Sequence, residues 1–359
     1  MREHPTVRKT PVAETPAALA PPTCRFDADR DLAFAHDAPG FGDVLHVFDA
    51  NWHGIRSASG CLPCHKLAIS NEEPFDAAAN RHIIGLIHKH RLRRIVFQGY
   101  SGVAHTLAAT IKREFKGAVR LYAVTHVTSA QFGHHFEIDM QRDIHQALQK
   151  GILSRAGSVK PHFDAVMPGT WPHLLVNMAP NIPHIDRPIG FDPGAVFIPI
   201  ENTWRKNLYT NVLAALPVAE VELIYSVNWP TALERIADLG KLKITPFRKG
   251  RDLLAFIGSM GALLGVTLAE CQPMTQLEAL AMGTPCLTGA LGIDEFADDP
   301  LIPLIEVAGA DNPAPIRAAL ERVLALRRDD PAALTQMIEA HLARRHALAV
   351  ERLGDFLEL

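Results

Sequence analysis

The stretch TLAECQPMTQLEALAMGTP, residues 267–285, predicts a strand, a loop, a helix and a second strand in succession. An apolar strand over 263–269 leads directly to Glu270, helix formers follow from 275 to 282, and Gly283 and Pro285 end that helix. The start of a helix offers unpaired backbone N–H groups and a positive partial charge, which suits a phosphate or a diphosphate. The candidate donors are the amides of Met274, Thr275 and Gln276.

The same alternation of short apolar runs and helical patterns extends along the chain from Asp43. The first half predicts strands at 43–49, 93–99, 119–126 and 163–169, with helices near 75–91, 102–115 and 137–150. After a proline-rich crossing at 180–199, further strands are predicted at 195–200, 220–227, 241–247, 263–269 and 284–289, with helices at 205–216, 230–239, 251–260 and 275–282 and long helices to the end. The sequence therefore predicts two doubly wound α/β domains, whose ligands bind at the carboxyl ends of the strands.

Composition excludes several classes of function. With 36 basic and 39 acidic side chains, the formal net charge of -3 provides no global field for nucleic acid or anionic membrane. Five cysteines are an odd number in a long chain and do not indicate a disulfide framework. No apolar run approaches the roughly 20 residues that span a bilayer, and the proline-rich residues 1–30 are expected to form a disordered leader and not a signal peptide. We therefore expect a cytoplasmic protein.

Glu270 and Glu278 form an E-x7-E pattern that is followed by ALAMGTP. This pattern resembles the donor-site signature of retaining nucleotide-sugar glycosyltransferases with the GT-B fold, in particular glycosyltransferase family four. The resemblance implies two Rossmann-like domains that face a central cleft. Residues 31–185 would form the acceptor-side domain and 186–340 the donor domain, and the terminal helix at 341–359 would pack back on the N-terminal domain.

The resemblance also implies roles for individual residues. Glu270 would bind the transferred sugar, Glu278 would accept hydrogen bonds from the ribose hydroxyls, and Lys206 would clamp the diphosphate with the amides at 274–276. Ile200 stands where the family has an arginine, and Arg205 is the candidate substitute. Gly54 would approach the phosphates, although the family's second glycine is missing. His126 would contact the sugar or help to take the acceptor proton. Phe247 and Pro246 would line the pocket of the base. Glu270, His126 and Lys206 form the candidate catalytic set.

Each of these residues also has a structural interpretation. Thr275 and Glu278 fit a capping box, which would satisfy backbone N–H groups without any ligand. Glu270 fits a solvated loop, Arg205 and Lys206 fit a charged first turn, and a histidine such as His126 at the end of a strand is often packed or solvated.

The motif CLPCHK at 61–66 contains Cys61, Cys64 and His65 in the spacing of a c-type haem attachment site. The sequence has no export signal and no second C-x-x-C, so we expect Gly60 and Pro63 to start a helix in which the thiols pack. His134, His135, Glu137 and Asp139 lack the spacing of a metal-binding helix, and an acceptor-side loop is the better interpretation. No cofactor and no bound metal are expected.

The implied reaction moves a sugar from a nucleoside-diphosphate sugar to a hydroxyl with retention of anomeric configuration, as in polysaccharide biosynthesis. The acceptor would be a saccharide, a lipid-linked molecule or a protein, and basic residues in the last helix leave peripheral membrane contact open beside a solvated face. Two alternatives are a nucleotide-sugar 2-epimerase, which needs no acceptor, and a non-catalytic GT-B scaffold that binds a nucleotide sugar. The scaffold is suggested by Ile200 and by the missing glycine.

Overall fold

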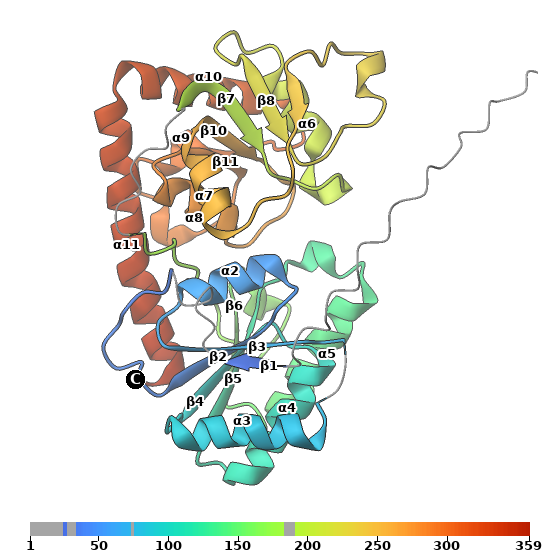
Figure 1. Cartoon of the computed structure of the whole chain (residues 1–359), viewed down its shortest axis with the longest axis vertical. Coiled ribbons are helices and arrows are strands. Elements are labelled where there is room, and N and C mark those ends of the chain that lie inside the picture. Colours follow the sequence, from blue (N-terminus) through green and yellow to red (C-terminus); the bar gives the residue numbers. More distant parts are fainter. Residues whose placement is uncertain (1–23, 27–33, 73–74, 183–190) are drawn as a thin grey trace, which may run out of the picture.

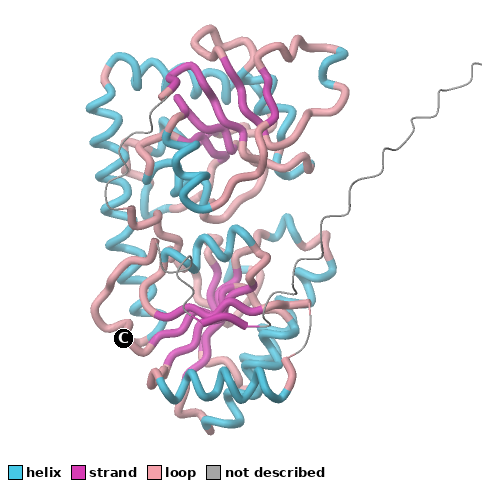
Figure 2. Tube along the Cα trace, in the orientation of Figure 1, coloured by secondary structure: helices cyan, strands magenta, loops and turns pink. Residues whose placement is uncertain are grey.

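The computed structural model describes residues 24–26, 34–72, 75–182 and 191–359, which form two α/β domains stacked along the long axis of the molecule (Figure 1). Most of the expected leader at 1–30 and the expected domain boundary at 185/186 lie outside the described residues. Each domain is built around its own sheet (Figure 2). The predicted fold class, two doubly wound α/β domains, is confirmed.

The N-terminal sheet has the strand order β1-β3-β2-β4-β5-β6, and its strands are parallel except for β1, which is antiparallel to β3. The strands are β1 (Cys24–Phe26), β2 (Val44–Asp49), β3 (His65–Ile69), β4 (Arg94–Gln98), β5 (Arg120–Thr125) and β6 (Arg155–Ser158). The helices are α2 (His53–Cys61), α3 (Ala77–Lys89), α4 (Gly102–Phe115) and α5 (His135–Gln149), with short 3-10 turns η1 (Ser129–Gln131) and η2 (Phe163–Ala165).

The C-terminal sheet has the order β12-β11-β10-β7-β8-β9, and all of its pairs are parallel. The strands are β7 (Asp192–Ile198), β8 (Leu223–Ser226), β9 (Leu242–Ile244), β10 (Met260–Gly265), β11 (Cys286–Gly289) and β12 (Glu306–Val307). The helices are α6 (Leu208–Ala215), α7 (Gly250–Gly258), α8 (Met274–Ala281), α9 (Ile302–Ile305), α10 (Pro313–Asp329) and α11 (Pro331–Leu357), with 3-10 turns η3 (Trp204–Lys206), η4 (Leu233–Arg235) and η5 (Asp294–Phe296).

Alternate residues of the central strands are buried on opposite faces of the N-terminal sheet. In β5, Leu121 and Ala123 join the apolar cluster that contains residues of α3, α4 and α5. Tyr122 and Val124 join a second cluster that contains residues of α2, α8 and α11. This second cluster crosses the domain boundary, because it includes Met274 and Leu277 of α8 in the C-terminal domain. Both faces of the strands are therefore covered, as parallel sheets require.

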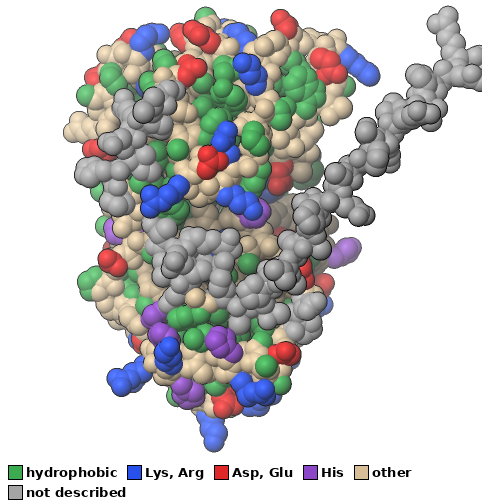
Figure 3. Space-filling model, in the orientation of Figure 1, with side chains coloured by type: hydrophobic (Ala, Val, Ile, Leu, Met, Phe, Trp, Pro, Cys, Tyr) green, Lys and Arg blue, Asp and Glu red, His purple; other side chains and the backbone are tan. Residues whose placement is uncertain are grey.

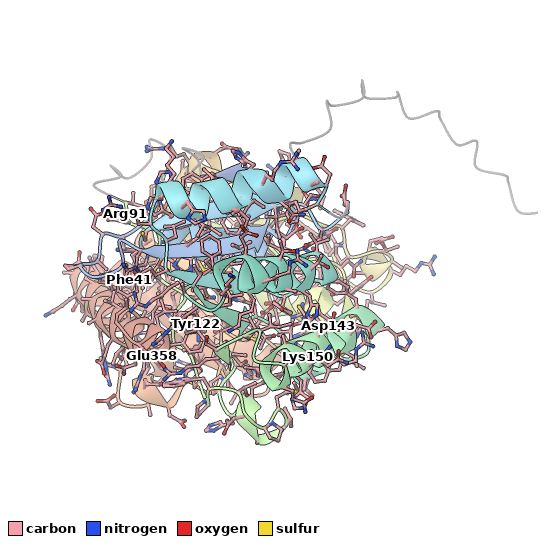
Figure 4. All side chains as sticks on the ribbon, turned by 90° about the horizontal axis from the view of Figure 1, so that it is seen from below. Phe41, Arg91, Tyr122, Asp143, Lys150 and Glu358 are labelled. Carbon is pink, nitrogen blue, oxygen red and sulfur yellow. The ribbon has the colours of Figure 1, made fainter. Side chains whose placement is uncertain are left out.

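The helix α11 runs along both domains (Figure 1) and ends on the N-terminal sheet. The carbonyl of Leu357 accepts hydrogen bonds from Arg94 Nε at 2.9 Å and from the Tyr122 hydroxyl at 3.2 Å. Glu358 forms ion pairs with Arg155, at 2.5 Å, and with Arg120. Figure 4 shows Glu358 near the part of the sheet that carries Tyr122. The last turn of the chain is thus fastened to the N-terminal domain.

Two predicted elements are wrong. Residues 163–169 do not form a strand and contain only the turn η2. The last strand of this sheet is β6, which lies earlier in the chain. Its Gly157 and Ser158 are poor strand formers, so the sequence gave no signal for it. Residues 230–239 do not form a full helix, and only the turn η4 is present. Ile236 is 81% exposed, whereas Leu233 and Leu239 are buried, so these two apolar residues of the segment pack without a full helix.

Three boundaries also differ from the expectation. The strand β3 at His65–Ile69 was not predicted, and Gly60 lies at the end of α2 and Pro63 beyond it, so neither starts a helix. The strand β10 ends at Gly265 and not at 269, so residues 266–270 form a loop and Glu270 does not follow the strand directly. This loop passes over β11 at Gly289, where a Cβ would lie 2.4 Å from the Thr267 carbonyl oxygen. Only glycine permits that approach.

Candidate functional site: the cleft between the domains

A cavity of 210 Å³ lies between the two domains. The N-terminal domain contributes Gly54 and His126 to its wall, and the C-terminal domain contributes Lys206, Glu270 and residues 273–276. These residues follow the carboxyl ends of strands in both sheets, where ligands of open α/β sheets bind. The structure therefore brings most of the predicted site residues to one place.

Two helices begin at this cavity, one from each domain. The first turn of α2 contains Gly54, and no atom lies within 4 Å of the position that a Cβ would take there. At the start of α8, the backbone N–H groups of Met274 and Thr275 have no acceptor among the described residues, whereas the N–H of Gln276 donates to the Pro273 carbonyl at 3.2 Å. Neither helix has a side-chain cap at its N-cap residue. Two positive helix ends thus flank the same space, an arrangement suited to an anion.

Three cations contact Glu270. Its Oε1 atom lies 2.5 Å from Lys206 Nζ and 3.2 Å from Arg205 Nη1, and its carbonyl oxygen accepts from Lys160 Nζ at 3.0 Å. On the face shown in Figure 3, Lys and Arg side chains lie at the level where the two domains meet. The cluster has more positive than negative charge, which again favours a negatively charged ligand.

Ile200, in the family's arginine position, lies in the cavity wall and is 6% exposed. Arg205 instead turns toward the loop of Glu270, where its Nη1 also donates to the Ala269 carbonyl at 2.8 Å. The guanidinium is therefore held next to the Lys206 ammonium through their shared carboxylate. Arg205 is not part of the cavity wall itself.

His126 follows β5 and lines the cavity. Its Nε2 atom lies 2.8 Å from Gln98 Oε1, and burial lowers the pKa of the imidazole to about 4. The ring is neutral at physiological pH, so it can accept a proton or a hydrogen bond but does not serve as a proton donor from a charged form.

Glu278 does not line the cavity but reaches across to α2, where Ser57 Oγ donates to its Oε1 at 2.5 Å. Burial raises the pKa of this carboxyl, and the bond from Ser57 offsets part of the effect. The capping-box alternative is wrong, because the N-cap of α8 is Pro273 and Thr275 lies inside the helix. Glu278 is thus free of the helix terminus and is engaged by the opposite domain.

Phe247 is 64% exposed and is not part of the cavity wall. Its ring lies 5.5 Å from that of His53, in the first turn of α2. The predicted base contact is therefore at the outer edge of the cleft, beyond the described cavity.

Several residues of the cleft were missed by sequence reasoning. Ser57 lies in a stretch for which no element is predicted, and Gln98 lies inside the predicted strand at 93–99. Lys160 follows β6, which was not predicted as a strand. Gln272 was read only as part of the loop, yet its amide contacts Val159 and Leu174 of the other domain at 2.9 and 2.8 Å. No sequence signal pointed to Lys160, because the short strand before it contains Arg155, Gly157 and Ser158 and is not an apolar run.

The two metal-like motifs form no metal cluster. Within the described ranges, no group of three or more His, Cys, Asp or Glu side chains could hold a metal ion. Cys61 is buried, and burial raises the pKa of its thiol, while His65 stacks on Phe26. The expected loop at 134–139 is wrong, because α5 begins at His135.

No helix among the described residues is long and apolar enough to cross a membrane.

Comparison with known proteins gives a fold but no family. No protein-family model matches the sequence, and no curated protein matches it. Sucrose-phosphate synthase from Thermosynechococcus elongatus has 12% identity and a TM-score of 0.53, with 88% of this chain and 98% of that chain covered. HepE from Anabaena in complex with UDP has 12% identity and a TM-score of 0.53, with 88% and 100% covered. A glycosyltransferase from Rickettsia africae has 10% identity and a TM-score of 0.51, with 88% and 97% covered.

These similarities confirm the GT-B fold that the E-x7-E pattern predicted. At identities of 10% and 12% they show the fold alone, because one architecture carries many activities. The chemistry must be argued from the cleft.

Proposed function

We propose that this protein is a glycosyltransferase that moves a sugar from a UDP-sugar to a hydroxyl acceptor. The observation that carries the proposal is the convergence of two uncapped helix N-termini and the cation Lys206 on one interdomain cavity, with Arg205 paired to the same Glu270 carboxylate as Lys206. A departing nucleoside diphosphate gains negative charge as its bond to the sugar breaks. Groups that bind this charge more strongly in the transition state than in the ground state accelerate the reaction.

The choice of nucleotide and sugar draws on the structural neighbours. HepE is described in complex with UDP and glucose, at a TM-score of 0.52 and 10% identity. We extend the UDP moiety to this chain as part of the proposal. The E-x7-E pattern of Glu270 and Glu278 supports three finer parts of the proposal. These are retention of configuration, membership of family four and a role in polysaccharide biosynthesis. The acceptor is a saccharide, lipid-linked or protein hydroxyl on the side of residues 31–185.

The roles of the side chains follow from their charges. Lys206 and the amides of α8 bind the diphosphate, and in the absence of a phosphate Glu270 neutralises Lys206. When the phosphate displaces this contact, the carboxylate of Glu270 is released toward the sugar. Its negative charge then faces the oxocarbenium-like carbon, while the cations face the leaving group.

The size of the cavity implies a movement. Its 210 Å³ is below the roughly 300 Å³ at which small-molecule sites begin, so we propose that the domains move apart to admit a nucleotide sugar. The bond between Ser57 and Glu278 joins the two domains and would break in that movement. Release of Glu278 then makes its carboxylate available to the ribose hydroxyls, the role that we propose for it. Reclosure would exclude water from the reacting sugar.

Donor binding and turnover test the function. A UDP-sugar at about 100 times its dissociation constant should stabilise the protein by roughly 2.7 kcal/mol, measured as a rise in Tm, and GDP-sugars should do so less. UDP release should depend on an added acceptor. We propose that no metal is required, because the cations and helix ends neutralise the diphosphate, so activity should survive EDTA.

Three results would count against this function. Turnover of a UDP-sugar to an epimer without acceptor would assign the protein to the epimerases. Binding without UDP release, over a broad set of acceptors, would make it a binding scaffold. A product with inverted anomeric configuration, seen by NMR of the glycoside, would remove the retaining mechanism alone.

A further inference from the structure

A chain of three polar side chains, of which the inner two are buried, leads from the cavity into the N-terminal sheet. His126 at the cavity contacts Gln98 at the end of β4, and Gln98 contacts His46 in the middle of β2. Gln98 and His46 are both 0% exposed. They lie on the face of the sheet whose other residues, Val44 and Val96 among them, form the apolar cluster shared with α2 and α8.

Polar groups in such surroundings are kept only where hydrogen bonds satisfy them, so the direction of each bond is constrained. Gln98 Oε1 accepts from His126 Nε2 at 2.8 Å, and Gln98 Nε2 faces His46 Nδ1 at 3.2 Å. An amide nitrogen only donates, so His46 Nδ1 must be the unprotonated nitrogen. An amide oxygen only accepts, so His126 Nε2 must carry the hydrogen.

The charge state of His46 limits its choices. Burial, and then the nearby ammonium of Lys66, hold the pKa of this imidazole well below its usual value, so the ring is neutral and has one hydrogen to place. Because Nδ1 faces the donor nitrogen of Gln98, that hydrogen belongs on Nε2, which has no other hydrogen-bond partner among the described residues. With that hydrogen on Nε2, Nδ1 is left to accept from Gln98.

We propose that Gln98, oriented by His46, is a positioning residue that holds His126 as the Nε2–H tautomer and directs its Nδ1 lone pair into the cleft as an acceptor for a substrate hydroxyl. No donor among the described residues contacts Nδ1, and His126 lines the cavity. The opposite tautomer would present an N–H to the cleft and could not accept from a hydroxyl. The kinetic half of this inference rests on the proposed glycosyltransferase function, whereas the tautomer can be measured without any substrate.

The first experiment is NMR of the full chain with 15N-labelled histidine, which identifies the protonated nitrogen of each neutral ring. His126 should be the Nε2–H tautomer in the substrate-free protein, with its signals assigned by their loss in His126→Gln. A wild-type His126 protonated at Nδ1 would overturn the inference without the need for any variant of Gln98.

The second experiment compares Gln98→Met with Gln141→Met. Methionine fills the space of Gln98 but neither accepts nor donates strongly, so the tautomer of His126 should become mixed and kcat/KM for UDP release should fall about tenfold. Gln141 is the matched control, because it is also buried, at 5% exposure, and donates to Thr125 Oγ1 at 2.9 Å, next to His126 but not to its ring. Gln141→Met should leave both readouts near the wild type.

Gln98→Glu provides a third arm, since a carboxylate still accepts from His126 Nε2 but has no hydrogen for His46. It should keep the tautomer that Gln98→Met loses. An unchanged tautomer in Gln98→Met, or an equal loss of kcat/KM in both methionine variants, would reduce Gln98 to a packing role. If the wild type releases no UDP, the glycosyltransferase proposal fails, and the NMR comparison alone then decides the positioning of His126.

Discussion

Glu270 and Lys206 make the shortest ion pair of the cleft, at 2.5 Å, with side chains 19% and 24% exposed. Pairs that remain in contact with solvent contribute about 0–1 kcal/mol to folding, so stability does not explain this contact well. A functional explanation is stronger: the carboxylate holds the ammonium at the cavity until a phosphate competes for it. The pair is then a preformed part of the diphosphate site.

Replacement of Lys206 tests this explanation. Lys206→Met keeps the aliphatic stem but removes the charge that faces the leaving diphosphate, so kcat for UDP release should fall about 100-fold. The Tm should change little, because the pair stabilises the fold weakly. Steady-state kinetics and thermal unfolding measure the two effects.

Lys243→Met is the matched control, because Lys243 is an exposed lysine in β9 of the same domain. It should leave kcat unchanged. Equal kcat for Lys206→Met and the wild type would show that the ammonium does not act on the leaving group.

The helices α2 and α8 face each other across the cleft and are joined by the bond between Ser57 and Glu278. Sequence periodicity predicted α8 within one residue but could not show what Glu278 contacts, because Ser57 lies 221 residues away. The capping box failed for a local reason. Pro273 takes the N-cap position, which moves Thr275 into the helix and away from any capping role.

A pair of variants separates the two roles of Glu278. Ser57→Ala removes the contact between the domains but leaves the carboxylate free, so UDP-sugar affinity should be kept or slightly increased. Glu278→Gln weakens hydrogen bonds to the ribose hydroxyls, and the dissociation constant should rise about tenfold, in line with 1.5–3 kcal/mol for bonds to charged groups. Isothermal titration with the same UDP-sugar measures both.

The comparison has a clear opposite outcome. If Ser57→Ala and Glu278→Gln weaken donor binding equally, Glu278 serves the contact between the domains and not the ribose. Burial raises the pKa of Glu278, and a higher pH favours its ionised form, so donor binding through this carboxylate should tighten as the pH of the titration is raised.

A buried polar hub around Arg345 is one of the contacts that hold the two domains together. Arg345 of α11 donates to the Asn177 carbonyl at 2.9 Å and to Gln272 Oε1 at 3.2 Å, and it is 2% exposed. Gln272 donates in turn to backbone carbonyls of the N-terminal domain, and Asn177 donates to the Gln272 carbonyl at 2.8 Å. The loop that carries Glu270 is thus tied to both domains.

Arg345→Met should destabilise the protein by about 2 kcal/mol, because it leaves the Asn177 carbonyl buried without its donor and removes one of the two donors to Gln272 Oε1. Denaturant unfolding measures the loss. Burial already lowers the pKa of this guanidinium to about 10, a sign of how little solvent reaches it.

Arg344→Met provides the control on the neighbouring position of α11. Arg344 pairs with Asp298 at the surface, with its side chain 41% exposed, so its loss should cost less than about 1 kcal/mol. Similar losses for both variants would contradict the idea that the hub at Arg345 holds the domains together.

The order of strands and helices along the sequence was sufficient to predict which residues meet at much of the site. Lys206 follows β7 and Glu270 follows β10, and these strands are neighbours in the sheet, so both residues reach the same edge. His126 follows β5 in the other sheet and meets them across the cleft. Periodicity and strand ends were sufficient for these residues because parallel strands place their carboxyl ends together.

The contacts between the domains were decided only by the tertiary structure. Ser57 meets Glu278, Lys160 meets Glu270, and Arg345 meets Asn177 over separations of 221, 110 and 168 residues. Local patterns carry information over a few turns or strands, whereas these pairs depend on how two separately folded sheets are packed and on where α11 returns. Lys206, Glu270 and His126 could therefore be placed at the cleft from the sequence, but their partners and the contacts between the domains could not.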